Sequence, residues 1–411
     1  MYSSSIAHRR SSTHSFFVSS CLVSAAMAMP HAILTPLLLN KGMTLPQITV
    51  MQALFSLVIL LTEFPSGVIA DLVNRKTLYI ASKIILAVFF LMVFAGTGPV
   101  ILMIAWGIYA LSASLNSGTL DAALVNNAKA TALDQRQAAQ RISWLVGRSS
   151  QIDISGMIIG GTLGGILYTT IGYNIYLISA LLAVLSIISV LLWFQIPETH
   201  VKRERHNTTS LQLFRSHISE SFHTVRESST VQFYIVLMTV LQCIIQIHFQ
   251  LWQGSFLDKG LSENTFLFLY LTFQAIGFLA GFLSKQSRFA RFLFAHPFLI
   301  SIPILLFLYA SLMSTGIASL IPYSAFIFIC TIIVNSCRAG INEAAPMEKI
   351  GAITSLSSAL SRLGGILSLC SMAVALHYAS AGIVVPIGLA AFWCCAAAVI
   401  VIGYQSTQLA H

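Results

Sequence analysis

In this chain of 411 residues, the long apolar stretches of the N-terminal half contain the ionisable side chains Glu63, Asp121, Arg148 and Asp153. An ionisable group within a membrane-spanning helix is costly, so it is by default a candidate for function. A buried carboxylic acid can take up a proton on one side of a membrane and release it on the other. These residues are therefore predicted to handle protons, with Asp153 and Glu63 as the first candidates and Asp121 as the next.

Asp153 is predicted to be the deepest of the three acids. It lies twelve residues beyond Arg141, which corresponds to roughly 18 Å along a helix and places it near the middle of a membrane. Arg148 and Asp153 are five residues apart, a poor spacing for an ion pair on one helix. We therefore expect Arg148 to meet Asp121 or Glu63 from a neighbouring helix. Structural ion pairing with Arg148 is the alternative role for these acids.

A polar face is expected on one helix of the C-terminal half. Gln242, Gln246 and Gln250 recur at a spacing that places them on one side of a helix, with His248 and Trp252 nearby. Lipid would reject this face, so it is predicted to line a water-filled cavity. Hydrogen bonds between helices are the alternative explanation.

The apolar stretches of the two halves carry different charges. No acid lies clearly inside a span of the C-terminal half, which instead offers Arg338 and Arg362. This difference predicts that protons are handled in the N-terminal half, while the C-terminal half meets the polar groups of a substrate. Arg362 is a candidate to attract an anionic or zwitterionic substrate.

Other chemistries find little support in the sequence. All seven cysteines fall in apolar stretches without Cys-x-x-Cys spacing, as expected for small buried hydrophobic residues. Four histidines in the polar stretch 195–230 are irregularly spaced, which favours a solvated linker over a metal site. We find no nucleotide-binding loop, no clustered metal ligands and no nucleophile motif. Neither enzymatic activity nor a metal or cofactor is predicted.

The composition requires a membrane. The chain is 56% hydrophobic and 9% charged, whereas an ordinary soluble domain is roughly 25% charged. Since a span needs roughly 20 mostly apolar residues, the chain is predicted to be an all-α polytopic membrane protein with twelve transmembrane helices. The predicted spans are 15–39, 47–70, 77–96, 99–125, 142–168, 172–194, 231–254, 264–284, 290–312, 317–340, 352–378 and 382–404.

The basic residues predict the orientation of these spans. Sixteen of the 22 Lys and Arg residues lie in or beside the segments that twelve spans place in the cytoplasm, and only Lys41 and Lys259 lie in the outer loops. Such an excess marks the cytoplasmic side and places both termini there. It also accounts for the net charge of +9 without any nucleic acid.

The predicted spans fall into two halves. Residues 1–194 form an N-terminal six-helix bundle, 195–230 a cytoplasmic linker and 231–411 a C-terminal six-helix bundle. The pentapeptide LGGIL occurs at 163–167 and again at 363–367, in the fifth span of each half. A matching position is what two parallel repeats would give, and a chance match is the alternative.

A segment after the second predicted span carries a family resemblance. The stretch GVIADLVNRK resembles the loop 2–3 signature of the major facilitator superfamily, G-x-x-x-D-[RK]-x-G-[RK]-[RK], with matches at Gly67, Asp71, Arg75 and Lys76. The preceding EFPSG resembles a variant of bacterial drug-efflux-like members. Together with twelve spans and a central linker, the resemblance covers the whole chain.

The resemblance implies that this segment is an inner gate, which holds the two halves together and favours an outward-open state. Asp71 could gain from the positive end of another helix and pair with Arg75. An ordinary basic turn is the alternative. Leu72 stands where the family has a basic residue, and Asn74 where it has a second glycine. Since Asn tolerates a left-handed backbone, the turn is expected to survive.

The fifth predicted span offers a second resemblance. Its stretch GMIIGGTLGG resembles the antiporter signature G-x-x-x-G-P-x-x-G-G at Gly156, Gly160, Gly164 and Gly165, while Gly161 replaces the proline. Glycines at i, i+4 and i+8 form a smooth face on which a second helix can pack closely. A packing face without any antiporter role is the equal alternative.

Together these features predict a secondary active transporter that exports a small organic molecule by proton-coupled alternating access. A carrier for metabolite uptake or facilitated diffusion is the second hypothesis, and a transporter-like receptor or scaffold is the third. The protein is expected to be a monomer that crosses the inner cell membrane many times. Its expected partners are a small-molecule substrate, protons and the lipid bilayer.

Overall fold

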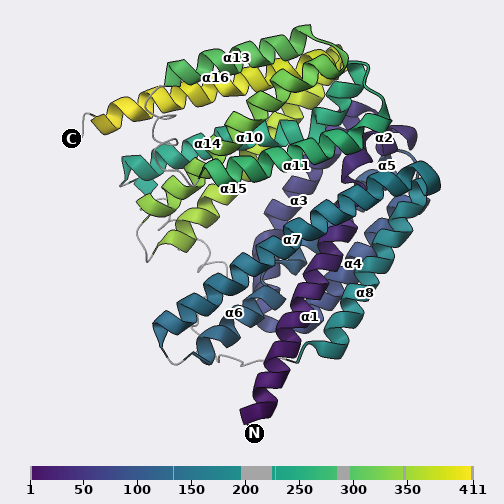
Figure 1. Cartoon of the computed structure of the whole chain (residues 1–411), viewed down its shortest axis with the longest axis vertical. Coiled ribbons are helices and arrows are strands. Elements are labelled where there is room, and N and C mark those ends of the chain that lie inside the picture. Colours follow the sequence, from purple (N-terminus) through teal and green to yellow (C-terminus); the bar gives the residue numbers. More distant parts are fainter. Residues whose placement is uncertain are drawn as a thin grey trace. The chain divides into compact units, whose positions relative to one another are not determined.

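A computed structural model describes residues 2–132, 134–195, 225–226, 228–284, 297–345 and 349–408. Throughout these residues the regular structure is helical (Figure 1). Within this described part of the chain, ten helical stretches are long and apolar enough to cross a membrane. The prediction of an all-α polytopic membrane protein is therefore confirmed. The count of twelve helices and the cytoplasmic termini stay predictions, and most of the predicted linker 195–230, with its four histidines, lies outside the described residues.

The first part of the chain forms helices of very different lengths. They are α1 (Tyr2–Ala28), η1 (His31–Ile33), α2 (Leu34–Asn40), α3 (Leu45–Leu72), α4 (Arg75–Ala95), α5 (Pro99–Asn116), α6 (Leu120–Ala130), α7 (Gln135–Ile171), η2 (Gly172–Asn174) and α8 (Ile175–Trp193). The apolar stretch Gln135–Trp193 is 59 residues long. It contains both α7 and α8, which part at Gly172, where φ is 55°. A residue with a side chain rarely adopts this backbone conformation, so the glycine suits the break.

Two of the predicted spans contain breaks. The span 15–39 runs from α1 through Pro30 and η1 into α2, and Pro30 cannot donate a backbone hydrogen bond to continue α1. The span 99–125 divides into α5 and α6 around Gly118, where φ is 72°. Hydropathy alone shows neither break.

The second part of the chain is also helical. Its helices are α10 (Ser229–Asp258), η3 (Glu263–Thr265), α11 (Phe266–Leu283), α13 (Pro297–Met313), η4 (Gly316–Ser319), α14 (Leu320–Ala344), α15 (Ile350–Tyr378) and α16 (Ala381–Gln408). Most of them match a predicted span closely. The described part of α13 is a shorter apolar helix, and the start of its predicted span, 290–312, lies outside the described residues.

The chain packs as two compact units. The first comprises Met1–Met43, Val58–Glu204 and Phe266–Leu271, and the second comprises Thr44–Leu57, Arg205–Thr265 and Thr272–His411. Part of α3 therefore belongs to the second unit, and the first turns of α11 belong to the first. The boundaries of the predicted halves stay a prediction.

The core of the first unit is built on close contact between α7 and α1. A Cβ atom on Gly160 would lie 2.6 Å from the Cα of Ala25, and one on Gly164 would lie 1.8 Å from the carbonyl oxygen of Met29. The prediction that the glycine face packs closely against a helix is confirmed. On a neighbouring face of α7, Gly161 lies against the ring of Tyr270 in α11, whose hydroxyl donates to the Met157 carbonyl at 3.0 Å.

The second unit uses its own LGGIL in the same way. There α15 packs on α10, and a Cβ on Gly364 would lie 2.9 Å from the Thr239 side chain. A Cβ on Gly365 would lie 3.0 Å from the side chain of Gln246. Both copies of the pentapeptide thus place glycines where one helix crosses another.

A lysine-glycine turn is also present in both units. In the first, Lys41 Nζ donates to the carbonyls of Phe94 and Gly96, at 3.1 and 2.8 Å, and lies 4.4 Å from the centre of the Tyr173 ring. The positive charge therefore sits at the C-terminal end of α4, where the helix dipole favours it. Burial lowers the pKa of the Lys41 ammonium below its ordinary value.

The second copy of this turn repeats the contacts of the first. Lys259 Nζ donates to the carbonyls of Ser311 and Ser314 around the end of α13, and burial again lowers its pKa. The glycine that follows each lysine has φ near +90°, 88° at Gly42 and 85° at Gly260. The two lysines predicted for the outer loops are therefore buried caps of helix ends.

Candidate functional site

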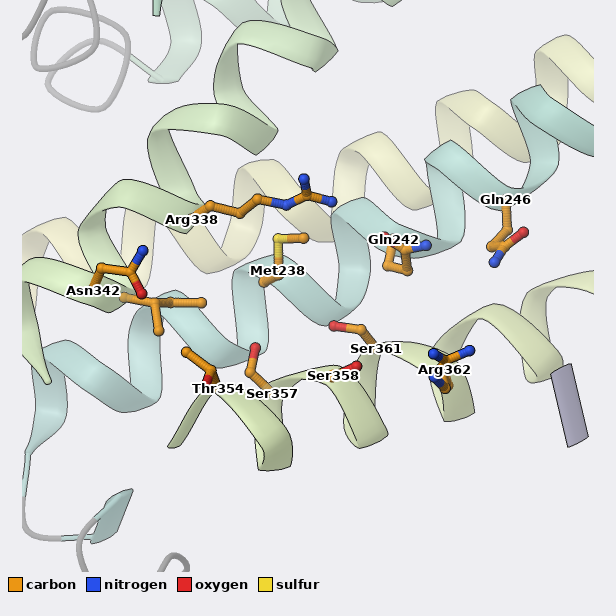
Figure 2. A pocket seen from close by; sticks show the side chains of 11 residues that line it. Met238, Gln242, Gln246, Arg338, Asn342, Thr354, Ser357, Ser358, Ser361 and Arg362 are labelled. Carbon is orange, nitrogen blue, oxygen red and sulfur yellow. The ribbon is translucent and has the colours of Figure 1, made fainter. Parts of the chain in front are cut away.

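A polar cavity of about 420 Å³ lies within the second unit (Figure 2). Three helices supply its walls, namely α10, α14 and α15. The lining residues are Met238, Gln242, Gln246, Arg338, Ile341, Asn342, Thr354, Ser357, Ser358, Ser361 and Arg362. This volume is within the range of about 300–1,000 Å³ that small-molecule sites usually occupy.

Helical spacing explains why the polar groups converge. Gln242 and Gln246 are one turn apart on α10, as are Arg338 and Asn342 on α14. On α15 the hydroxyl residues recur over two turns, and Arg362 follows the last of them. Figure 2 shows these side chains pointing into one space from the three helices. Each helix therefore turns a polar face to the cavity.

The cavity is rich in hydrogen-bond donors. Two guanidinium groups, those of Arg338 and Arg362, border it, and no acid is among the described residues that line it. A guanidinium presents a planar fork of donors that matches a carboxylate or a phosphate. The amides and hydroxyls around it can both donate and accept. The arrangement therefore suits a small polar solute with a negative charge.

The predicted polar face of α10 divides into two environments. Gln242 and Gln246 line the cavity, whereas Gln250 is outside its lining. His248 and Trp252 are buried in an aromatic cluster around Phe273. The centre of the Phe273 ring lies 4.9 Å from that of His248 and 5.2 Å from that of Trp252.

His248 has a specific polar partner inside that cluster. Its Nδ1 lies 3.1 Å from the Tyr323 hydroxyl, which can act as donor or acceptor. This contact joins α10 to α14, so it satisfies a buried imidazole between two helices. It matches the alternative explanation of the polar face of α10, which is hydrogen bonding between helices.

Arg362, Gln242 and Gln246 of this cavity are predicted from the sequence as substrate-contacting residues, but the rest of the lining is not. Arg338 is recognisable in the sequence as a charge of the C-terminal half, without a predicted site. The hydroxyl groups of Thr354, Ser357 and Ser361 lie on one face of α15 at spacings of three and four residues. That spacing is the signal from which they could have been found.

The predicted proton-handling residues occupy different environments in the first unit. Asp153 is half-buried on α7, and its Oδ1 accepts a hydrogen bond from Ser24 on α1 at 3.0 Å. Glu63 and Asp121 are exposed. Arg148 is exposed as well and donates to Gln151 of its own helix at 3.1 Å. The expected contact of Arg148 with Asp121 or Glu63 stays a prediction.

The gate-like segment forms the end of α3 and the start of α4. Gly67 and Asp71 lie in α3, but the Asp71 side chain is outside the described part of the chain. Arg75 begins α4. Lys76 Nζ donates to the Phe194 carbonyl, just beyond the end of α8, at 2.8 Å.

The turn at Asn74 survives, but without the left-handed backbone that asparagine tolerates. Its φ is −55°, and its side chain caps α4 by accepting from the backbone N–H of Thr77 at 3.1 Å. Asn is a favoured residue at this capping position. The turn therefore survives because asparagine supplies a helix cap.

The fold and the cavity define a class of protein. Many apolar helices, three of which line a polar cavity, are features that membrane transporters share. A family model described as Major Facilitator Superfamily matches residues 16–369. The chain belongs to this superfamily, which confirms the resemblance seen in the gate-like segment.

Solved structures agree on the fold. The nucleoside transporter NupG superposes with a TM-score of 0.69 at 13% identity, over 97% of this chain and 99% of that chain. A bacterial homologue of the human lysosomal transporter Spinster, solved inward-facing and unoccupied, gives a TM-score of 0.66 at 14% identity, over 96% and 95% of the two chains. A search of curated protein sequences found no match.

Proposed function

We propose that this superfamily transporter exports a small organic anion by proton-coupled alternating access. In this proposal twelve helices cross the inner cell membrane, both termini are cytoplasmic, and the protein works as a monomer. The observation that carries the proposal is the cavity of the second unit, which Arg338 and Arg362 border while its described lining contains no acid.

The cavity supports a solute with a carboxylate or phosphate group. Within a membrane protein, an arginine is costly unless it has an oppositely charged partner or reaches water. A bound anion would supply such a charge and accept donors from Arg338. The amides of Gln242 and Gln246 and the serine hydroxyls of α15 would hydrogen-bond the remaining polar groups.

Asp153 supports the choice of protons as the coupling ion. It is half-buried within the apolar stretch that contains α7, and a serine from another helix donates to it. A carboxyl group in such a place can bind a proton when the transporter opens to one side of the membrane and release it when the transporter opens to the other. Glu63 and Asp121 are secondary candidates, because both are exposed.

Export rests on the resemblance of EFPSG and of the glycine face to drug-efflux-like and antiporter sequences. Uptake or facilitated diffusion of a metabolite is the second candidate. The same cavity would serve either direction. A measured direction of solute movement separates the two.

The solute site can be tested by direct binding. Purified protein in detergent is screened by thermal shift against carboxylates, phosphates and neutral molecules of matched size. We expect Arg338→Gln and Arg362→Gln each to weaken binding of the best anion about 10- to 100-fold, because a hydrogen bond to a charged group contributes about 1.5–3 kcal/mol.

Arg226→Gln serves as the control for the loss of one arginine charge. Arg226 lies just before α10 and is exposed, away from the cavity lining. We expect it to keep the affinity of the wild type. An anion that binds equally well to the wild type and both cavity variants would contradict the anion site.

A further inference from the structure

Ser361 places a buried hydroxyl at the polar cavity of the second unit. Only 7% of this residue is exposed, and its Oγ has no hydrogen-bond partner among the described residues. The Thr354 hydroxyl, on the same face of α15, instead donates to the Ile350 carbonyl of its own helix at 2.8 Å. A buried hydroxyl without a partner has lost its hydrogen bond to water and gained none in return. Because Ser361 lines the cavity, a solute in the cavity would supply the partner.

The helices α14 and α15 pack on different sides of α10. On α14, the Cys337 thiol donates to the carbonyl of Tyr234 at 3.2 Å. On α15, a Cβ on Gly364 would lie 3.1 Å from the carbonyl oxygen of Thr239. These two contact points on α10 are five residues apart, which corresponds to about 140° of rotation around a helix. Side chains beside the two contacts therefore reach the cavity from different directions.

The two guanidinium groups of the cavity follow this arrangement. Arg338 comes directly after Cys337 on α14, and Arg362 lies two residues before Gly364 on α15. Figure 2 shows the two guanidinium groups apart from each other, with the side chain of Gln242 between them in this view. The cavity therefore offers two separate places for an anionic group.

The charges at the cavity have one sign. No acid is among the described residues that line it, and Glu343, the only acid of α14, is exposed and outside the lining. Like charges repel each other most where water is scarce. A solute with a single negative charge would offset one guanidinium, whereas a solute with two would offset both.

We infer that the cavity binds an organic dianion whose two acidic groups lie at opposite ends of a short chain with a polar middle. One acidic group would contact Arg338 and the other Arg362. A hydroxyl between them would bond the free Ser361 hydroxyl and the amide of Gln242. The structure favours a dianion over a zwitterion, because the ammonium of a zwitterion would lie near a second guanidinium.

This inference rests on the proposed function, because it names the substrate class of the same cavity. It also makes a stricter demand than the proposed function does. An anion site needs only one negative charge in the solute, whereas the inferred site needs two that lie apart. Solutes that differ only in the second charge therefore separate the two statements.

Binding of matched carboxylates to the full chain in detergent tests the inference. Thermal-shift titrations at neutral pH compare succinate, glutarate and adipate with the monocarboxylates of the same chain length, and with γ-aminobutyrate. We expect at least one dicarboxylate to bind about 10- to 100-fold more tightly than its monocarboxylate, because a second charge-assisted contact contributes such a factor. γ-Aminobutyrate should bind no better than butyrate.

The outcomes separate the inference from the proposed function. Equal affinities for dicarboxylates and monocarboxylates would overturn the dianion and leave the anion site standing. Phosphonopropionate, in which a phosphonate replaces one carboxylate, should also bind more tightly than a monocarboxylate, and its affinity relative to succinate shows which acidic group the site prefers. If no anion bound, the anion site of the proposed function would fail as well.

The cavity variants give a readout that a loss of stability does not imitate. Arg338→Gln and Arg362→Gln should each abolish the preference for the dicarboxylate over its monocarboxylate, because one guanidinium remains to hold one carboxylate. Arg226→Gln, on an exposed arginine outside the lining, should keep the preference. A preference that both cavity variants keep would overturn the inference. If neither variant folds, the wild-type comparison alone decides.

The polar middle of the solute has its own test. Malate is succinate with one added hydroxyl, and we expect it to bind about 2- to 10-fold more tightly, as one neutral hydrogen bond would allow. Ser361→Ala should remove this advantage. Ser355→Ala, on an exposed serine of α15 outside the lining, should keep it. An advantage of malate that persists in Ser361→Ala would overturn the contact with the Ser361 hydroxyl.

Discussion

Gly164→Ala is the substitution whose effect follows most directly from the structure. The new Cβ would lie 1.8 Å from the carbonyl oxygen, 2.5 Å from the carbonyl carbon and 2.8 Å from the Cα of Met29. All three are backbone atoms, so no side chain can rotate away. The helices α1 and α7 would have to separate by about 1 Å before the contact became tolerable, which would loosen their packing along several turns.

The expected cost can be set against a matched control. Overpacking in a well-packed interior costs about 1–3 kcal/mol and occasionally more. At an unhindered helical site, the same change stabilises by about 0.5–1 kcal/mol, because glycine loses more freedom on folding. Gly147 is on the same helix with no atom within 4 Å of an added Cβ. Gly164→Ala should therefore be less stable than Gly147→Ala by roughly 2–4 kcal/mol.

Unfolding of the purified variants in detergent, followed by circular dichroism during heating, measures this difference. We expect Gly147→Ala to melt at or above the wild-type temperature and Gly164→Ala clearly below it. Gly160→Ala, whose Cβ would lie 2.2 Å from the Ala25 carbonyl oxygen, should behave like Gly164→Ala. Equal melting temperatures for all variants would refute the assignment of this face to the α1–α7 contact.

Three further predictions concern the turns and the cavity. Burial lowers the pKa of the Lys41 ammonium, so the unfolded chain binds this proton more tightly than the folded chain does. The stability of the folded protein therefore rises as the pH rises toward the ordinary lysine pKa. The difference in melting temperature between the wild type and Lys41→Met should increase over this alkaline range, and a constant difference would contradict the prediction. Asn74→Ala should cost about 1 kcal/mol through loss of the α4 cap, whereas Asn74→Asp keeps an acceptor and should melt like the wild type. Ser361→Ala should weaken binding of the anion less than Arg338→Gln does in the same thermal-shift titration, because its hydroxyl is neutral; an equal loss would argue against a charge-based site.

Helix packing was predictable where spacing alone decides it. The glycine face of α7 could be predicted, since side chains at i, i+4 and i+8 share one side of any helix. The breaks at Pro30 and Gly118 could not, because a hydropathy window averages over them. Proline and glycine also occur within unbroken helices here, as Pro65 does in α3.

The site was predictable only in part, for a similar reason. Periodicity and charge indicated Gln242, Gln246 and Arg362, which all line the cavity. Serines were missed because most serines in helices bond a carbonyl of their own helix, as Ser336 does with Ile332 at 2.8 Å. The convergence of α10, α14 and α15 on one cavity depends on which helices adjoin, and a single sequence does not contain that information.

Transport driven by a pH gradient tests the central claim most directly. Wild-type protein and Asp153→Asn are reconstituted in proteoliposomes, and the movement of the anion that most stabilises the protein is followed with and without the gradient. The account predicts that the wild type moves the anion against the flow of protons, and that Asp153→Asn loses this coupling while it remains folded. Movement that is indifferent both to the gradient and to Asp153→Asn would contradict proton-coupled export.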